Sequence, residues 1–525
     1  MSQLTKPSKG VKRSVADPSH SYHSLTPLWK KARAILQGQS NVKAHDELLE
    51  AEYKNILLPF SPSMTQAQYD FYRSEAELPG LTTQYAKTLI NALLRKKSSL
   101  VLPEGLPEDA KEWIENNFTL DGKSLFNFLD AALWEELQTS HCWVYVDRPK
   151  VSDEEFDAMS QEERMMIAPY PVIIKAENVI NVQTSIHPIT RIKSLTRLVT
   201  RYMTEEYNPG NPWHPDYIDT VADHYLDSTG QLVIDYYRRE GGGNYNEIKI
   251  LNGTVKQDYK EELAAGAFTK FDTATPTMFG QRLTRIPAWP LNGHHDPIEP
   301  MLIPLVDREI SLYNKLSRRN HLLYGAATYT PIVKSDMTDE EFGDLVNAGL
   351  GSWLKVRKDE DISVLETPTA ALADMENSIA NTVNEMAKMG IRMLSPEASS
   401  SGIALEIRNA AQTAQLGTLN VKVSTVMRDV ITFMLNWKYG TMIENKDVDF
   451  TMSSDFAPVV AGENSMRLVS EWYQGGIISR STFLRIAKYN DFLPADYDDE
   501  SAIEEIQTDP LAQQTATDPE LDIEE

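Results

Sequence analysis

The sequence is poor in cysteine and has no long apolar run. Only one of its 525 residues, Cys142, is a cysteine, which excludes an internal disulfide and a zinc site built on cysteines. The segment Ser140–Val146 around it alternates like a strand, so we expect Cys142 to be a small buried hydrophobe. No stretch approaches the roughly 18 consecutive apolar residues of a transmembrane helix, and the N-terminus has no signal-peptide core. These absences predict a protein that is neither secreted nor inserted in a membrane.

Sequence motifs for catalysis are also missing. The chain has no H-E-x-x-H, G-x-S-x-G, Walker or G-x-G-x-x-G pattern. Gly241-Gly242-Gly243 has no helical pattern after it and lies between two strand-like runs, which predicts a hairpin turn. His294-His295-Asp296 is the one tempting metal cluster, but adjacent histidines point in different directions, so we favour a solvated turn. We therefore expect no enzymatic activity, no cofactor and no metal.

Positive charge is scarce, and the net charge is −25. Residues 1–43 hold eight Lys or Arg and one acid, whereas residues 496–525 hold twelve acids and no Lys or Arg. We expect 1–43 to be a basic arm, flexible at least to about Pro27, and 508–525 to be an acidic disordered tail. Such an acidic chain is not built to grip DNA through phosphate contacts, although it could let a duplex slide past.

The pattern of hydrophobic residues predicts an α+β fold. Residues 44–167 read as mainly helical, with an i, i+4 stripe over Leu81–Leu93 and a helix capped by Ser124. Residues 170–290 read as mostly strands, of which Leu232–Tyr237 is typical.

The second half has an unusual order of elements for an enzyme. It reads as a helix at 304–324, an α/β insert at 326–368, a helix at 369–393, a serine-rich loop, a long helix at 403–440 and a helical segment at 463–507. This order suits a protein that builds the wall of a pore.

Several polar residues would face such a pore. They are Lys315, Arg318, Arg319, Ser395, Glu397, Ser399, Ser400 and Ser401. The three cations are either a solvated, salt-bridged helix end or, repeated by rotational symmetry, a positive ring. The serine-rich residues are either an ordinary surface loop or a loop that projects into the channel.

The long helix has an unusually small-residue surface. Gly402, Ala410, Ala414 and Gly417 let another helix or a neighbouring subunit approach closely, and an ordinary packing face within the chain fits equally well. Gly417 inside the helix costs about 1 kcal/mol relative to Ala and predicts a kink.

Four local sequence patterns occur in a fixed order along the chain. They are Tyr72-Arg73-Ser74-Glu75-Ala76 before Leu81–Leu94, the crossing Ile286-Pro287 to Pro290-Leu291-Asn292-Gly293, the helix Asp307–Tyr324 and the helix start Ser401-Gly402-Ile403-Ala404-Leu405. In these patterns and in their order the chain resembles the bacteriophage portal proteins, the head-to-tail connectors. The resemblance covers most of residues 50–490, and the order of the patterns is more specific than any one of them.

The resemblance implies a portal-type fold with named parts. These are an α/β wing at 44–296, a stem helix at 297–325, a small α/β clip at 326–368, a second stem helix at 369–392, a tunnel loop at 393–402, a long kinked wing helix and its return at 403–462, and a helical crown at 463–507. Portal proteins form rings, usually of twelve subunits, at one capsid vertex of the virion, and they assemble in the host cytoplasm.

The resemblance also implies partners. Double-stranded DNA would pass through the ring during packaging and ejection, without sequence readout. Terminase, major capsid or scaffold proteins, and head-completion or tail adaptor proteins would bind its outside. Two other readings stay open, namely a virion scaffold or minor capsid protein that does not conduct DNA, and a nuclease or hydrolase with a dispersed acidic site.

Overall fold

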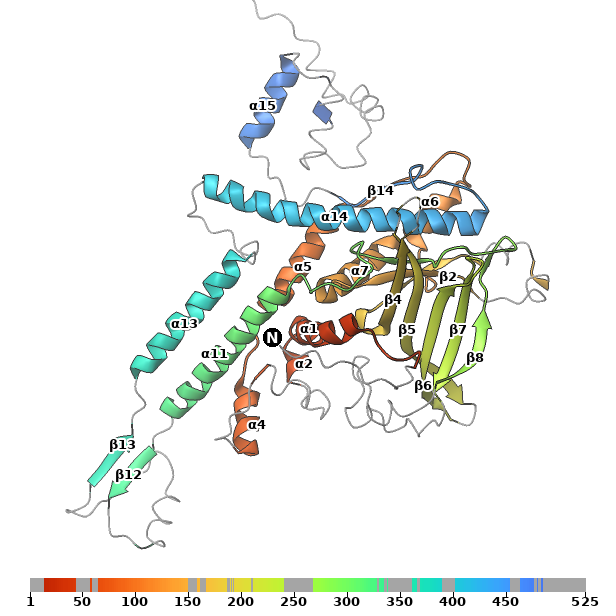
Figure 1. The fold of residues 1–525 in the computed structure, drawn as a ribbon. Coiled ribbons are helices and arrows are strands. Elements are labelled where there is room, and N and C mark those ends of the chain that lie inside the picture. The colour runs from red at the N-terminus through yellow and green to blue at the C-terminus, as the bar shows by residue number, and fades with distance from the viewer. Residues whose placement is uncertain are drawn as a thin grey trace, which may run out of the picture. The chain divides into compact units, whose positions relative to one another are not determined.

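A computed structural model gives the arrangement of the chain (Figure 1). It describes residues 14–43, 57–58, 65–149, 158–160, 167–186, 189, 191, 193–208, 211–239, 268–327, 330–334, 338, 361–365, 369–389, 402–453, 463–475, 479 and 483–484. The chain divides into two compact units, residues 1–454 and 455–525, and each is described by itself.

The first unit begins with a helical layer. Its helices are α1 (His20–Leu36), α2 (Gln39–Val42), α4 (Gln66–Glu75), α5 (Leu81–Leu93), α6 (Asp109–Asn116) and α7 (Leu125–Thr139). The predicted cap of α7 is confirmed, because the Ser124 hydroxyl accepts a hydrogen bond from the Asn127 N–H at 3.3 Å.

The expectation of a flexible arm up to about Pro27 is wrong for residues 14–43. Helix α1 starts at a Ser19 cap, continues through Pro27, and buries Trp29 completely. The polar composition of the first turns concealed an apolar second half, in which Ala32 and Ile35 are also fully buried. Burial of these side chains outweighs the missing N–H of an internal proline.

Two antiparallel sheets follow. The smaller has the order β11-β2-β3, and the larger has the order β4-β5-β6-β7-β8. Their strands are β2 (Trp143–Asp147), β3 (Tyr170–Ile174), β4 (Val179–Ile186), β5 (Lys193–Asn208), β6 (Asn211–Leu226), β7 (Leu232–Arg239), β8 (Phe268–Ala274) and β11 (Ala288–Pro290). The strand-like segment around Cys142 is thus confirmed in β2, and Cys142, just before it, is fully buried as predicted.

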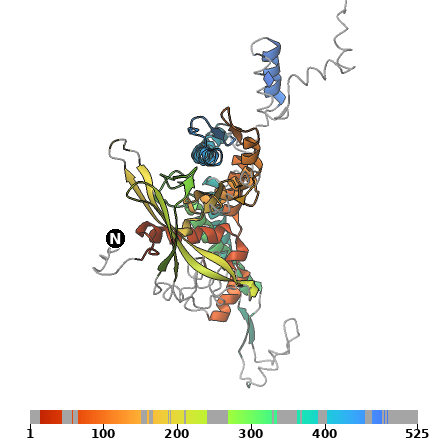
Figure 2. The same ribbon diagram turned by 90° about the vertical axis from the view of Figure 1, so that its right-hand side faces the viewer.

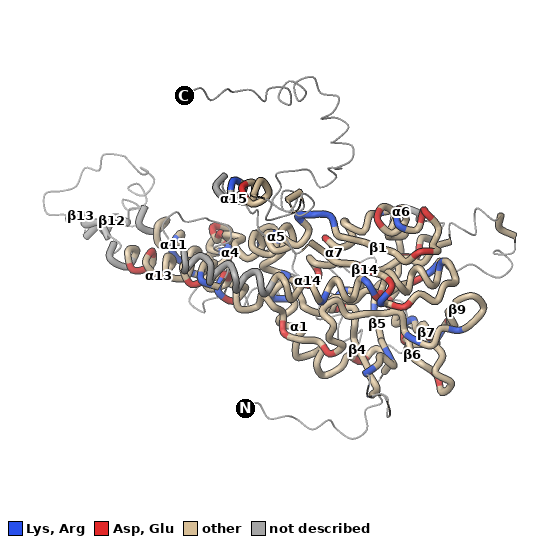
Figure 3. Tube along the Cα trace, turned by 90° about the horizontal axis from the view of Figure 1, so that it is seen from above, with Lys and Arg blue, Asp and Glu red and all other residues tan. Residues whose placement is uncertain are grey.

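The five-stranded sheet has two chemically different faces. One face approaches the smaller sheet, where His224 of β6 meets Tyr145 of β2 with ring centroids 5.1 Å apart. The other face carries cross-strand ion pairs, in which buried aspartates meet cations on neighbouring strands: Arg197–Asp223, Arg201–Asp219 and Lys270–Asp235. Figure 3 shows Lys and Arg interspersed with Asp and Glu over this unit.

The order predicted for the second half is confirmed where residues are described. Helix α11 (Ile303–Ala327) leads to strands β12 (Thr330–Lys334) and β13 (Asp361–Leu365), which pair antiparallel. Helices α13 (Thr369–Lys388) and α14 (Gly402–Tyr439) follow. The rest of the α/β insert expected at 326–368, apart from Thr338, and the glycine hairpin turn expected at 241–243 fall outside the described residues.

Helix α14 is continuous over 38 residues, and Figures 1 and 2 show it straight. The kink expected at Gly417 is therefore absent. A straight helix is possible because no atom outside the helix lies within 4 Å of the position where a Cβ would stand on Gly417. No packed neighbour forces a bend there.

Two short strand pairs and one further helix complete the description. Strand β1 (Ser99–Val101) pairs with β14 (Asp449–Thr451), and β9 (Thr277–Met278) pairs with β10 (Gln281–Arg282). In the second unit, α15 (Glu463–Gln474) places Tyr473 against Phe483, with ring centroids 4.9 Å apart. Within the described residues, no helix has the length and apolarity needed to span a membrane.

Candidate functional site: the α11–α13 helix pair

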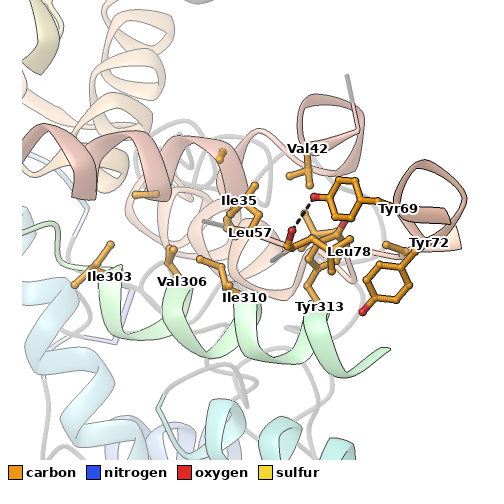
Figure 4. Close-up of a cluster of buried hydrophobic side chains, with 14 residues drawn as sticks. Ile35, Val42, Leu57, Tyr69, Tyr72, Leu78, Ile303, Val306, Ile310 and Tyr313 are labelled. Carbon is orange, nitrogen blue, oxygen red and sulfur yellow. Dashed lines mark hydrogen bonds between the residues drawn. The ribbon is translucent and has the colours of Figure 1, made fainter. Parts of the chain in front are cut away.

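Helix α11 is anchored on one side by a core that α1, α2, α4 and the segments on either side of α4 build (Figure 4). Four of its residues, Ile303, Val306, Ile310 and Tyr313, face this core at helical spacing. They meet buried side chains from the earlier segments: Ala32, Ala34, Ile35, Val42, Leu57, Leu58, Tyr69, Tyr72, Ala76 and Leu78. The first half of α11 is therefore a fixed support.

A buried carboxylate locks α11 to α5. Glu309 is fully buried, and its two oxygens accept the N–H groups of Leu81 at 2.9 Å and Thr82 at 2.8 Å. The N-cap of α5 is Gly80, which has no side chain to satisfy these groups. Glu309 therefore serves as the cap from a helix more than 200 residues away, with its negative charge at the positive end of α5.

Helix α13 lies antiparallel to α11 on another side (Figure 1). The Lys315 ammonium group donates to the Thr382 hydroxyl at 2.6 Å and to the Ser378 carbonyl at 3.3 Å. Near the other end, Arg308 pairs with Glu385 at 3.2 Å, with both side chains about half exposed. Lys315 is thus engaged between the two helices.

The last turns of α11 contact α4. Arg318 is exposed, and its charge acts on the Tyr72 side chain, while the ring of His321 meets Tyr72 edge-on with ring centroids 5.5 Å apart. Burial raises the pKa of Tyr72, and the Arg318 charge opposes that shift. Arg319 is half-buried, and its Nε has no hydrogen-bond partner among the described residues. The predicted cations thus lie on one helix in three different environments, and their place in a channel stays a prediction.

Helix α13 is covered mainly on its α11 side. Thr382 and Met386 are buried there. The opposite surface is exposed and contains a stripe of amides at helical spacing, which we call the amide stripe: Asn377, Asn381 and Asn384. A second exposed stripe beside it is small or apolar, with Ala373, Ala380 and Val383. These two stripes were not singled out from the sequence, although the spacing of the asparagines could have revealed the first.

The other candidate residues lie away from this pair or outside the description. Ser395, Glu397, Ser399, Ser400 and Ser401 fall outside the described residues. Gly402 is the first residue of α14, and Ala410 and Ala414 lie within the same helix, while Gly417 is in open space. Whether this surface packs against another subunit stays a prediction.

The described residues offer little chemistry beyond packing. They contain no group of three or more His, Cys, Asp or Glu that could hold a metal ion. His294 and Asp296 are exposed, in keeping with the predicted turn. A pocket of about 180 Å³ between α5, α11, α13 and α14 is lined almost entirely by apolar side chains. The pocket therefore offers few groups that could bind a polar ligand.

One more buried carboxyl lies near the end of α7. Glu136 accepts the Cys142 N–H at 3.1 Å, and burial raises the pKa of its carboxyl to about 8. Burial also raises the pKa of the Cys142 thiol, so this cysteine is unreactive as a nucleophile. Both groups fit a structural role.

Comparisons with known proteins add a match to one family model over part of the chain and likenesses to solved structures. The model of a domain of unknown function (DUF4055) matches residues 301–438, which run from the start of α11 almost to the end of α14. The sequence has no match among curated proteins.

Among solved structures, the chain is similar to chains from the virion of a native gene transfer agent (GTA) particle and from the neck of an empty GTA particle. Both similarities have 13% identity and a TM-score of 0.39, and they cover 79% and 78% of this chain and 90% and 91% of the other chains. A chain in the neck of the native GTA particle, computed with C12 symmetry, has 13% identity and a TM-score of 0.37 over 78% of this chain and 90% of that chain. At these values the likenesses are too weak to support an argument.

Proposed function

We propose that this protein is a portal-type subunit, a head-to-tail connector that forms a ring and lines a channel for double-stranded DNA. The observation that carries the proposal is the asymmetry of the α11–α13 pair. Helix α11 is anchored in the core of its own subunit, whereas α13 is packed mainly against α11 and leaves two stripes exposed. In a ring, one exposed stripe would meet the next subunit and the other would face the channel.

The chemistry of the exposed stripes fits those two roles. Ala373, Ala380 and Val383 would allow a neighbouring subunit to approach closely. The amide stripe presents neutral hydrogen-bonding groups, and the nearby charges on α13 are mostly acidic. A wall of amides and carboxylates would hold a DNA duplex weakly, because tight binding needs clustered Lys and Arg against the phosphates. The proposal includes no catalytic step.

The segment that carries these features coincides with residues 301–438, which match the domain of unknown function. The order helix, strand pair, helix, long helix in that segment is also the order on which the sequence resemblance to portal proteins rests. The proposal extends to partners of the virion, namely a packaging motor, capsid proteins and tail adaptors.

Native mass measurement with negative-stain imaging of the same fraction tests the proposal. We expect closed rings of about a dozen subunits with a central opening near duplex width, about 20 Å. Compact assemblies without an opening would favour a virion scaffold that does not conduct DNA. Metal-dependent DNA cleavage by the purified protein would instead favour a nuclease.

A further inference from the structure

The hairpin of β5 and β6 extends beyond its sheet. Strand β4 pairs with β5 only as far as Thr200, and β7 pairs with β6 only from Thr220 onward. Beyond these points, residues 201–208 and 211–219 form a two-stranded ribbon, which we call the arm (Figure 2). An isolated ribbon of this kind is marginally stable in water.

Polar links fix the arm to the sheet. Asp219 is buried and accepts from the Arg201 guanidinium at 2.5 and 3.0 Å across the base of the arm. Further out, Glu206 pairs with Arg238 of β7 at 2.6 Å. These two ion pairs restrict how far the arm can bend relative to the sheet, and so they fix the position of its tip.

The tip exposes two large aromatic side chains. Tyr207 is 63% exposed and Trp213 is 85% exposed, and they lie on opposite sides of the turn. Tryptophan and tyrosine are the side chains that most often dominate binding at protein interfaces, where each fills a pocket on the partner. Such exposure on a braced arm has no structural benefit for the isolated subunit.

The charge of this hairpin restricts what can bind it. The arm, residues 201–219, holds four acids, Glu205, Glu206, Asp216 and Asp219, and one cation, Arg201, which pairs with Asp219. This excess of negative charge disfavours nucleic acid and anionic lipid, since each is bound through Lys and Arg. A second copy of this chain is acidic overall, so its surface offers the arm fewer cations than a basic partner protein does.

We infer that the arm is a docking element for a different protein, whose surface combines Lys or Arg with an apolar slot for the Trp213 ring. Trp213 is the anchor, Tyr207 supports it, and Glu205 supplies charge complementarity. This inference does not depend on the channel, because a protein that forms no ring could use the same arm.

The first experiment places a photo-crosslinking phenylalanine derivative at position 213, in the full-length protein and in the cell that makes it. The matched control carries the same derivative at Ser228, which is exposed at the opposite end of β6. We expect position 213 to yield one dominant crosslinked peptide, from another protein and beside a cluster of Lys or Arg. A crosslink to this same chain, to lipid or to nucleic acid overturns the inference, and so does a yield no higher than at position 228.

The second experiment measures how tightly the purified protein binds the purified partner that the crosslink identifies. Trp213→Ala should weaken binding about 30-fold, the effect of a typical interface anchor. Leu120→Ala, which removes another exposed apolar side chain, should leave binding unchanged. Glu205→Lys should weaken binding several-fold more than Glu104→Lys, an equal charge change at another exposed site. The inference is overturned if Trp213→Ala weakens binding no more than Leu120→Ala, and Glu205→Lys no more than Glu104→Lys. Unchanged melting temperatures would confirm that all four variants fold.

Discussion

Helices α11 and α13 lie side by side but are held in different ways. Most side chains in the first half of α11 are buried, and α11 also provides Glu309 as the cap of α5. Helix α13 buries few side chains, which meet α11, and exposes the rest. The difference shows which helix belongs to the subunit's own core and which is placed to meet something outside it. Five substitutions test or sharpen this comparison.

The largest expected effect is on the α11 side. Glu309→Ala should lower the free energy of unfolding by about 3 kcal/mol, because it removes two charge-assisted hydrogen bonds and leaves two buried N–H groups at the start of α5 without acceptors. Urea unfolding measures the loss, and hydrogen exchange should place it at Leu81 and Thr82. The control is Asp307→Ala on the same helix, which breaks an exposed pair with Lys31 and should cost less than about 1 kcal/mol. Equal losses would mean that Glu309 is not an essential support.

On the α13 side, Met386→Ala should lower the free energy of unfolding by about 2 kcal/mol, because it leaves a cavity in place of a fully buried side chain. The loss should be local, since α13 has few other attachments. Limited proteolysis should therefore show faster cleavage within residues 369–389 and little change elsewhere. Met389→Ala, at a 40% exposed position one turn later, is the control and should have a much smaller effect. Uniform destabilisation of the whole unit would show that α13 is part of the core.

The difference between the two helices was only partly predictable from sequence. Periodicity and composition located both helices and the α/β insert between them, in which β12 and β13 lie, because apolar spacing and strand composition are local properties. The cap of α5 by Glu309 could not be predicted, because it joins residues 228 positions apart and a glutamate in a helix reads as solvated. Lys315 read as part of a basic cluster for the same reason, although it donates to Thr382. The amide stripe was visible in the sequence, but only the packing shows that α11 does not cover it.

Glu136 of α7 is a second buried carboxyl that can be compared with Glu309. It accepts one backbone N–H, from Cys142, whereas Glu309 accepts two. Burial raises the pKa of the Glu136 carboxyl from 4.5 to about 8, so the folded protein keeps a proton that the unfolded chain releases above its lower pKa. Stability should therefore fall as the pH rises from about 4.5 to 8. Glu136→Gln should remove this dependence and stabilise the protein at pH 8, with little change at pH 4. Melting curves at the two pH values measure this effect, and an equal change at both would rule out proton uptake as its cause.

The smallest effect on stability is expected on the outer surface of α13. Asn381→Arg should change the free energy of unfolding by less than about 0.5 kcal/mol, because the side chain is exposed. In a ring, however, every subunit would add one cation to the channel wall. Under the proposed function, rings of this variant should retain DNA more tightly, and the added retention should disappear between about 50 and 200 mM salt.

Arg318→Glu is the companion to that variant, because it tests whether the other helix of the pair also faces DNA. If Arg318 lines the channel, the substitution should reduce DNA retention by intact rings, and if it faces only α4, DNA retention should not change. Asn381→Arg with retention unchanged at every salt concentration would remove the amide stripe from the channel wall. Opposite changes in the two variants would place both helices along the path of the duplex, although only α11 is held by the core of its own subunit.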